Sequence, residues 1–245
     1  NGKWRFNFSK NPIERPLNFH QTDFDDSKWP LINVPGHWEL QGWSAPVYLD
    51  EEYLFPANPP NVSVERNEVG SYRKTFQYPV FWRGRDVFIR LSGVSSSFYL
   101  WINGKKVGYS QGSKTPAEFN ITQYVKNGQN NVSLEVYRFS DGSYLEGQDT
   151  WRLSGVERDI HIYSVPKTRI KDFSVSSGLD SLYTDGEFKL GINLQSSESN
   201  TGKHVISALL SRKEGRRNVV LDSTIKTKID NDKTIWFESI IKKVD

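Results

Sequence analysis

The sequence predicts an all-β protein built from two sandwich domains, and three observations support that prediction. Apolar and polar residues alternate in short runs along much of the 245-residue chain, as half-buried strands require. No window carries the i, i+3, i+4, i+7 apolar stripe of an amphipathic helix. Turn-forming residues separate the runs, so the strands follow one another closely, as in a sandwich or jelly roll.

The clearest strands of the first domain lie between residues 86 and 165. Four runs alternate: DVFIRL (86–91), SSFYLWINGKKVGY (96–109), NNVSLEVYRFS (130–140) and RDIHIYSV (158–165). The second run contains Asn103–Gly104, a pair that suits a two-residue type I′ hairpin because both turn positions need positive φ. We therefore expect a hairpin that turns at Asn103 and Gly104.

A change in composition near residues 164–173 marks a domain boundary, and we place the domains at 1–166 and 167–245. Beyond it the aromatic density falls, and alternation recurs in residues 170–177, 186–195, 204–212, 218–229 and 234–244. An immunoglobulin-like sandwich needs about seven strands over about 100 residues, so the second domain reads as a truncated one. An unpaired strand edge recruits other chains, and we therefore expect dimerisation or aggregation through this domain.

One long segment shows no period. Residues 33–61, NVPGHWELQGWSAPVYLDEEYLFPANPPN, are dense in Pro, Gly and Trp. Segments this long and irregular are usually functional or wrap another surface. Because its aromatic side chains need burial, we expect this segment to pack over the sandwich.

The composition of the chain limits the classes of partner that it could bind. Aromatic residues make up 13% of the chain, enough for a large core and compatible with sugar binding. The net charge of +3 is too small to indicate a nucleic-acid partner, and the basic run RKEGRR (212–217) is interpreted as a solvated hairpin face rather than an anionic docking patch. There is no cysteine, and no apolar run approaches the roughly 20 residues that span a bilayer. We expect a soluble protein of the cytoplasm or periplasm, with no membrane partner.

Several long motifs, in order, resemble the sugar-binding domain of family 2 glycoside hydrolases, closest to the large multi-domain β-galactosidases. They include NGKWRF at the start, VPGHWELQGWSAPVY (34–48), NPP (58–60), residues 91–122 and SDGSYLEGQDTWRLSGVERDI (140–160). The resemblance implies a galactose-binding-like jelly roll, then an immunoglobulin-like domain, then a catalytic (β/α)₈ barrel that this sequence does not reach. The fragment alone should be inactive, with no catalytic residue of its own.

The resemblance also implies two substrate-binding residues. Asp141 of the SDGSY motif would bind galactosyl hydroxyls and help to ligate a sodium ion, although an Asp before Gly is often only a turn residue. Asn58 would lie at the galactose subsite, although it could equally serve the proline turn that follows it. Sodium and magnesium are the cofactors implied for the intact enzyme, and neither is expected to bind the fragment tightly. A β-galactoside, the enzyme's own barrel and further copies of the chain in a homo-oligomer are the implied partners.

The remaining acids of the loop have a catalytic and a structural interpretation. Retaining hydrolysis needs two carboxyl groups about 5–5.5 Å apart, and Glu146 with Asp149 would be the pair. Nothing in their spacing requires facing carboxylates, so we favour loop acids that satisfy backbone N–H groups.

The same choice arises for the aromatic and basic side chains. Trp151 and Arg152 could form a sugar platform; we favour Trp151 as a core anchor and Arg152 in a bidentate pair with Asp149 or Glu157. His37 could be an acid or base but lacks a partner nearby in sequence, so a structural role is favoured. Three other aromatic residues are expected to pack, with Tyr144 holding Asp141 in place: Trp38, Trp43 and Tyr144.

The leading hypothesis is thus a non-catalytic N-terminal part of a β-galactosidase that completes the galactose subsite. A stand-alone carbohydrate-binding module is the alternative from another class, and it would need a solvent-facing aromatic platform. A plain interaction sandwich is a third. Two other family 2 glycosidases, β-glucuronidase and β-mannosidase, share the domain order, but the segment SDGSYLEGQDTWR favours a galactosidase.

Overall fold

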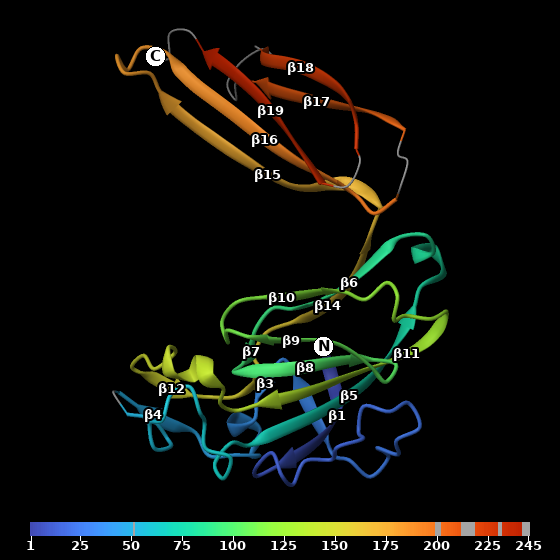
Figure 1. The fold of residues 1–245 in the computed structure, drawn as a ribbon, viewed down its shortest axis with the longest axis vertical. Coiled ribbons are helices and arrows are strands. Elements are labelled where there is room, and N and C mark those ends of the chain that lie inside the picture. The colour runs from blue at the N-terminus through green and yellow to red at the C-terminus, as the bar shows by residue number, and fades with distance from the viewer. Residues whose placement is uncertain (51, 199–201, 212–218, 230–231, 242–245) are drawn as a thin grey trace. The chain divides into compact units, whose positions relative to one another are not determined.

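A computed structural model describes residues 1–50, 52–198, 202–211, 219–229 and 232–241. The chain divides into two compact units, Asn1–Ser164 and Val165–Asp245 (Figure 1). Strands dominate the described residues, and the only helices among them are three 3₁₀ turns: η1 (Glu39–Gln41), η2 (Val80–Trp82) and η3 (Asp141–Tyr144). This confirms the all-β prediction. None of these helices could cross a membrane.

The first unit is a sandwich of a large and a small antiparallel sheet. The six-stranded sheet has the order β2 (Leu31–Val34), β1 (Gly2–Ser9), β5 (Val69–Tyr78), β11 (Gly128–Tyr137), β8 (Ser97–Ile102) and β9 (Lys105–Gln111). The other layer has the order β10 (Ala117–Asn120), β6 (Asp86–Leu91) and β14 (Ile160–Val165).

Two further sheets of short strands complete this unit. One has the order β3 (Gly36–His37), β13 (Gly155–Val156) and β7 (Val94–Ser95), and the other pairs β12 (Thr150–Arg152) with β4 (Val47–Leu49). Both sheets join part of the irregular segment to part of the loop that follows β11.

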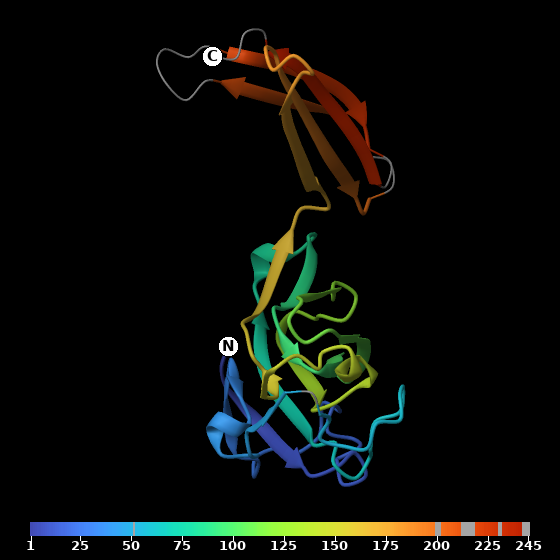
Figure 2. The same ribbon diagram turned by 90° about the vertical axis from the view of Figure 1, so that its left-hand side faces the viewer.

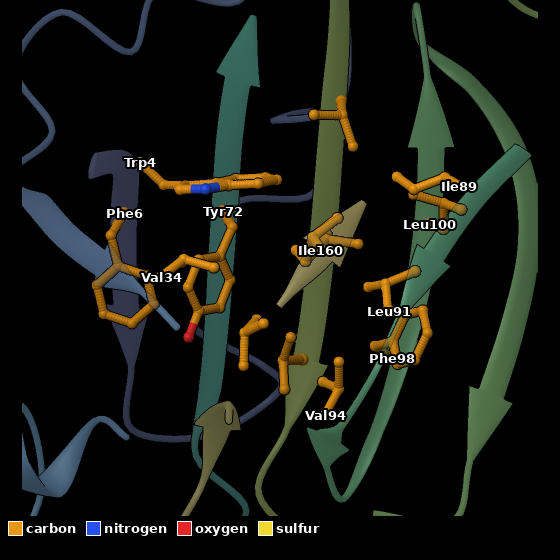
Figure 3. Close-up of a cluster of buried hydrophobic side chains, with 14 of the residues drawn as sticks. Trp4, Phe6, Val34, Tyr72, Ile89, Leu91, Val94, Phe98, Leu100 and Ile160 are labelled. Atoms are coloured by element: carbon orange, nitrogen blue, oxygen red, sulfur yellow. The ribbon is translucent and has the colours of Figure 1, made fainter. Parts of the chain in front are cut away.

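The core fills the space between the two main layers. Figure 3 shows Ile89 and Leu91 of β6 facing Leu100 and Phe98 of β8, and all four are at most 3% exposed. These are the residues whose alternation predicted the strands, so this part of the fold follows from the sequence. The hairpin is also confirmed, because Asn103 and Gly104 join β8 to β9 with φ of 50° and 78°.

The irregular segment packs on the sandwich, as expected. Trp38 is fully buried, and its Nε1–H donates a hydrogen bond to the hydroxyl of Tyr72 on β5. Gly70 makes this possible, because a Cβ at that position would lie 2.5 Å from the Trp38 ring. Trp43 packs edge-on against Phe6, with ring centroids 5.0 Å apart. The packing roles predicted for Trp38 and Trp43 are confirmed.

The second unit contains two antiparallel sheets among the described residues (Figure 2). One has the order β15 (Thr168–Leu179), β16 (Gly186–Ser196) and β19 (Asp232–Ile241), and the other pairs β17 (Lys203–Ser211) with β18 (Val219–Lys228). All five predicted strands are present. The RKEGRR run lies outside the described residues, so its interpretation stays a prediction.

β15 is an edge strand of its sheet and exposes an apolar face. Phe173 pairs with Ile192 of β16, so both side chains point to one face of the sheet, yet Phe173 is 66% exposed and Ile192 only 6%. Val175 is likewise exposed. The core of this unit, formed between the two sheets, therefore extends under β16 and β19 but leaves β15 uncovered.

Replacing Tyr72 with Phe tests the contact between the irregular segment and the sheet. The variant leaves the buried Trp38 N–H without its acceptor, which we expect to lower the free energy of unfolding by about 1–3 kcal/mol at neutral pH. Urea denaturation measures the difference. Tyr183→Phe, at a side chain that is 78% exposed, is the control.

The stability of the Tyr72→Phe variant should also depend on pH differently from that of the wild type in alkaline solution. Burial raises the pKa of Tyr72 far above its usual range, so the fold holds the neutral phenol. The stabilisation from the neutral form is complete below about pH 10 and decreases as pH rises above that value, because the unfolded chain then loses the proton. Tyr72→Phe should lose less stability than the wild type above pH 10. If the free energy of unfolding fell equally steeply with pH above 10 in the variant and the wild type, the assignment would be contradicted.

Candidate functional site

The site predicted from the sequence begins in the turn η3, directly after β11. Two reciprocal hydrogen bonds between Ser140 and Ser143 close the turn. The Ser140 N–H donates to Ser143 Oγ (3.0 Å), and the Ser143 N–H donates to the Ser140 carbonyl (2.9 Å). Asp141 is the first residue of the turn and is exposed. Its Oδ1 accepts the Gly142 N–H (3.0 Å), and Oδ2 accepts no hydrogen bond from the described part of the chain. One carboxylate oxygen is therefore free for a ligand.

Tyr144, the last residue of η3, connects this turn to the turn that carries Asn58. Its hydroxyl donates to the Asn61 carbonyl (2.6 Å) and accepts the Asn58 N–H (3.0 Å). The 58–61 turn is closed by a further bond from the Asn61 N–H to the Asn58 carbonyl (2.8 Å). One phenol therefore holds together the two segments that carry Asn58 and Asp141. The contacts of Tyr144 position the 58–61 turn, a role that the sequence did not predict.

A hollow of about 410 Å³ lies between these segments. Residues 60–62 and Asp141 belong to its lining, together with Tyr99, Tyr109 and Tyr137, which we call its floor because they lie on strands of the sheet. Burial raises the pKa of Tyr109, and the negative charge of Asp141 raises it further, whereas a hydrogen bond with Ser97 lowers it. The carboxylate of Asp141 is thus close enough for its charge to act on the floor of the hollow.

The other acids of the loop have structural partners. Glu146 accepts hydrogen bonds from the Ser113 N–H (2.9 Å) and the Ser113 hydroxyl (2.5 Å). Asp149 accepts a hydrogen bond from the hydroxyl of Tyr48, and Glu157 forms an ion pair with Lys114 at 2.5 Å. Glu146 and Asp149 are therefore fixed by separate partners, which supports the structural interpretation of this pair.

The predictions for Trp151 and Arg152 are wrong. Trp151 is 55% exposed and packs edge-on against Tyr48, across the small β4–β12 sheet. The strand of Trp151 pairs with one other strand at the surface, so Trp151 has a cross-strand neighbour in Tyr48 but no core to pack into. Arg152 Nη1 donates to the Gln148 carbonyl (2.8 Å). Its expected partners are engaged elsewhere, Asp149 with Tyr48 and Glu157 with Lys114.

His37 lies in β3, where it pairs with Gly155 of β13. Its Nδ1 is buried and has no hydrogen-bond partner among the described residues. No ion pair within the described part of the chain joins His37 to a carboxylate, so nothing there supports acid or base chemistry at this residue.

A buried charge cluster around Arg138 is the feature that sequence reasoning missed. Arg138 follows β11 directly, and its Nη1 lies 2.7 Å from Glu68 Oε2 and 2.9 Å from Ser44 Oγ. Its Nη2 lies 3.6 Å from Glu39 Oε1, and the Glu39 side chain is completely buried. The other Glu39 oxygen accepts the Ser154 N–H (2.9 Å). The cluster thus joins the irregular segment, the start of β5 and the end of the long loop.

The residues that the structure describes contain no group of three or more His, Asp or Glu side chains that could hold a metal ion. Asp141 alone offers an exposed carboxylate oxygen at the predicted sodium position. It could supply one ligand of a cation whose remaining ligands come from another source.

The first unit is a β-sandwich, and the family comparison agrees with this fold. Residues 1–166 match the model of the glycosyl hydrolases family 2 sugar binding domain, and the chain belongs to this family. The chain is 46% identical to a β-galactosidase of Priestia megaterium over 198 residues, covering 79% of this chain and 19% of that protein. It is 36% identical to a β-galactosidase of Streptococcus thermophilus over 244 residues, covering 98% of this chain and 23% of that protein.

Solved structures show the same fold. Bacteroides uniformis β-glucuronidase 2 superposes with a TM-score of 0.74 at 20% sequence identity, over 98% of this chain and 27% of that one. The chain therefore spans about a fifth to a quarter of the length of these relatives.

Replacing Tyr144 with Phe tests the link between the two turns. The ring still packs against Tyr53 and Phe55, so we expect stability to fall by only about 0.5–1.5 kcal/mol. The Asn58 amide should exchange faster with solvent and shift in the NMR spectrum, since it loses its acceptor. Unchanged exchange at Asn58 would show that the hydroxyl does not hold the turn.

Replacing Arg138 with Met tests the buried cluster. The variant leaves the Glu39 carboxylate buried without its cation, which should cost about 3–5 kcal/mol of unfolding free energy. Arg138→Lys, which keeps the charge, should cost less and remain measurable if the Met variant does not fold. Lys171→Met removes an ion pair whose side chains are 45% and 49% exposed, and its loss of stability should be far smaller because solvent screens the pair. Equal losses for the Arg138→Met and Lys171→Met variants in urea denaturation would refute the role of the cluster.

Proposed function

We propose that this chain is the non-catalytic N-terminal part of a β-galactosidase, a retaining hydrolase of β-D-galactosides such as lactose, and that it completes the galactose subsite. The observation that carries the proposal is the bond network of Tyr144, which joins the turn of Asn58 to the turn of Asp141. Pro60 and Asn61 of the first turn and Asp141 of the second line one hollow, and Asn58 lies next to that lining in sequence. The β-galactosidases among the relatives, of which the chain spans 19 to 26%, support the assignment.

The residues described here would bind the sugar and not break its bond. Ionised Asp141 is an acceptor only, so it can take hydrogen bonds from galactosyl hydroxyls through its free oxygen. The Asn58 amide can both donate to and accept from a sugar hydroxyl. Hydrolysis needs a nucleophile and an acid about 5–5.5 Å apart, and Glu146 and Asp149 are held by other partners. We assign the reacting carboxyl groups to a (β/α)₈ barrel outside this chain.

Sodium fits Asp141, because a hard monovalent cation prefers oxygen ligands. Asp141 would hold the ion together with ligands from the barrel, so the isolated chain should bind sodium poorly. Magnesium belongs to the intact enzyme in this proposal, and no residue of this chain is assigned to it. The barrel and further copies of the chain in a homo-oligomer are the proposed protein partners.

A carbohydrate-binding module is the second candidate, and one observation favours it. The module needs a solvent-facing aromatic platform, and Tyr109 on the floor of the hollow is 42% exposed. The β-glucuronidases among the solved structures share the fold at 20% identity or less, which gives no ground to prefer glucuronides as substrate.

Asp141→Asn in the full-length protein tests the proposed role. The variant loses a charged acceptor, so kcat/KM for lactose should fall roughly 10- to 100-fold, and the response to sodium should diminish. Asp23→Asn, at an exposed carboxylate elsewhere in the first unit, is the matched control and should change neither. Unchanged kinetics and sodium response for Asp141→Asn would refute the role, and hydrolysis of a chromogenic galactoside by the 245-residue chain alone would refute the division of labour.

A further inference from the structure

The floor of the hollow is a row of tyrosines on the outer face of the six-stranded sheet. Tyr99 on β8 is paired with Tyr109 on β9, and Ser97, two residues earlier, is paired with Tyr137 on β11. The ring centroids of Tyr99 and Tyr109 are 4.9 Å apart, and those of Tyr99 and Tyr137 are 6.2 Å apart. These three rings point away from the core, because Phe98 and Leu100 on β8 face inward.

Most of this outer face is covered, and the tyrosine row is where the cover ends. The segment between β1 and β2 covers part of the sheet and is bound to it by two contacts. Its Arg15 pairs with Glu135 of β11 at 3.3 Å, and its Gln21 carbonyl accepts a hydrogen bond from Arg73 of β5 at 2.9 Å. His20 of that segment stacks on Trp101, with centroids 5.1 Å apart. Tyr109, at the other end of the aromatic row, is 42% exposed.

The exposed ring borders polar groups. The Tyr109 hydroxyl donates to Gln111 Oε1 (2.8 Å). A Cβ on Gly142, the neighbour of Asp141, would lie 3.9 Å from Gln111 Cδ, so the end of β9 is in contact with the Asp141 turn. Asp141 and Tyr109 both line the hollow.

This combination fits one class of ligand. A hexopyranose has a C–H face that packs on an aromatic ring and hydroxyls that donate to a carboxylate. The volume of about 410 Å³ falls within the roughly 300–1,000 Å³ typical of small-molecule sites. A row of rings without an adjacent acceptor would suit a protein partner as well, but Asp141 in the same lining favours a neutral, hydroxyl-rich ligand.

We infer that the tyrosine hollow is a saccharide subsite of this chain itself: Tyr109 stacks on a hexopyranosyl residue next to the galactosyl group held at Asp141. The inference rests on the proposed function for the identity of the sugar, a β-galactoside. It goes beyond that function because the tyrosine subsite needs nothing from the barrel.

Titration of the 245-residue chain with lactose, followed by NMR of the tyrosine ring resonances, tests the inference. We expect weak saturable binding with shifts centred on Tyr109. Tyr109→Ala should weaken the affinity about three- to tenfold, the range typical of one aromatic contact, whereas Tyr109→Phe should keep it. Phe81→Ala, at a ring that is 80% exposed elsewhere in the first unit, is the matched control and should have no effect.

Three results would overturn the subsite: no binding at the solubility limit of lactose, binding that Tyr109→Ala leaves unchanged, or equal losses in Tyr109→Ala and Tyr109→Phe. Circular dichroism of each variant checks that the fold is retained. The titration involves no hydrolysis, so its failure leaves the kinetic role of Asp141 intact. Conversely, a full-length protein without galactosidase activity would refute the proposed function without removing the lactose subsite.

Discussion

The candidate site depends on one buried guanidinium. Arg138 follows the central strand β11 and meets the carboxylates of Glu68 and Glu39, which reach it from the start of β5 and from the irregular segment. Taking the charges of Arg138 and Glu39 out of water is costly unless their remaining donors and acceptors are satisfied. Ser44 and the Ser154 backbone contribute two of those bonds, whereas Arg138 Nε and Glu39 Oε1 have no hydrogen-bond partner among the described residues. Segments without regular structure are thereby held against a rigid sheet, which gives the turn of Asp141 a fixed base.

The candidate site is assembled from elements that lie far apart in the sequence. The turn η3 contributes Asp141 to the lining of the hollow, the 58–61 turn contributes Pro60 and Asn61, and β8, β9 and β11 contribute tyrosines. Only the rings lie on regular structure, so their spacing follows from the sheet register. The two turns have no such template, and the phenol of Tyr144 joins them through hydrogen bonds to the first and last residues of the 58–61 turn.

Sequence reasoning predicted the elements whose pattern is local. The strand at 86–91 and the Asn103–Gly104 hairpin are confirmed because alternation and turn chemistry act between near neighbours. β5 gave no such signal, since five consecutive residues from Val69 are buried, with the covering segment on one face and the core on the other. Two covered faces remove the alternation that marks a half-buried strand.

The candidate site was predictable only in part, for the same reason. Asp141 and Asn58 were identified from motifs, but Tyr144 acts on a turn 83 residues away, and Arg138 pairs with Glu68 across 70 residues. Such pairs leave no spacing to recognise in one sequence. Trp151 shows the opposite error: a large aromatic side chain suggests a core, although its strand has only β4 as a neighbour.

Gly70 shows how closely the two kinds of structure are fitted together. A single carbon added there would collide with both Trp38 and Phe6, at 2.5 and 2.8 Å. The central sheet thus comes into backbone contact with the indole of the irregular segment, and no layer of side chains cushions the junction. A larger residue at position 70 would force the rings of Trp38 and Phe6 to move, so the way the irregular segment packs on the sheet depends on this glycine.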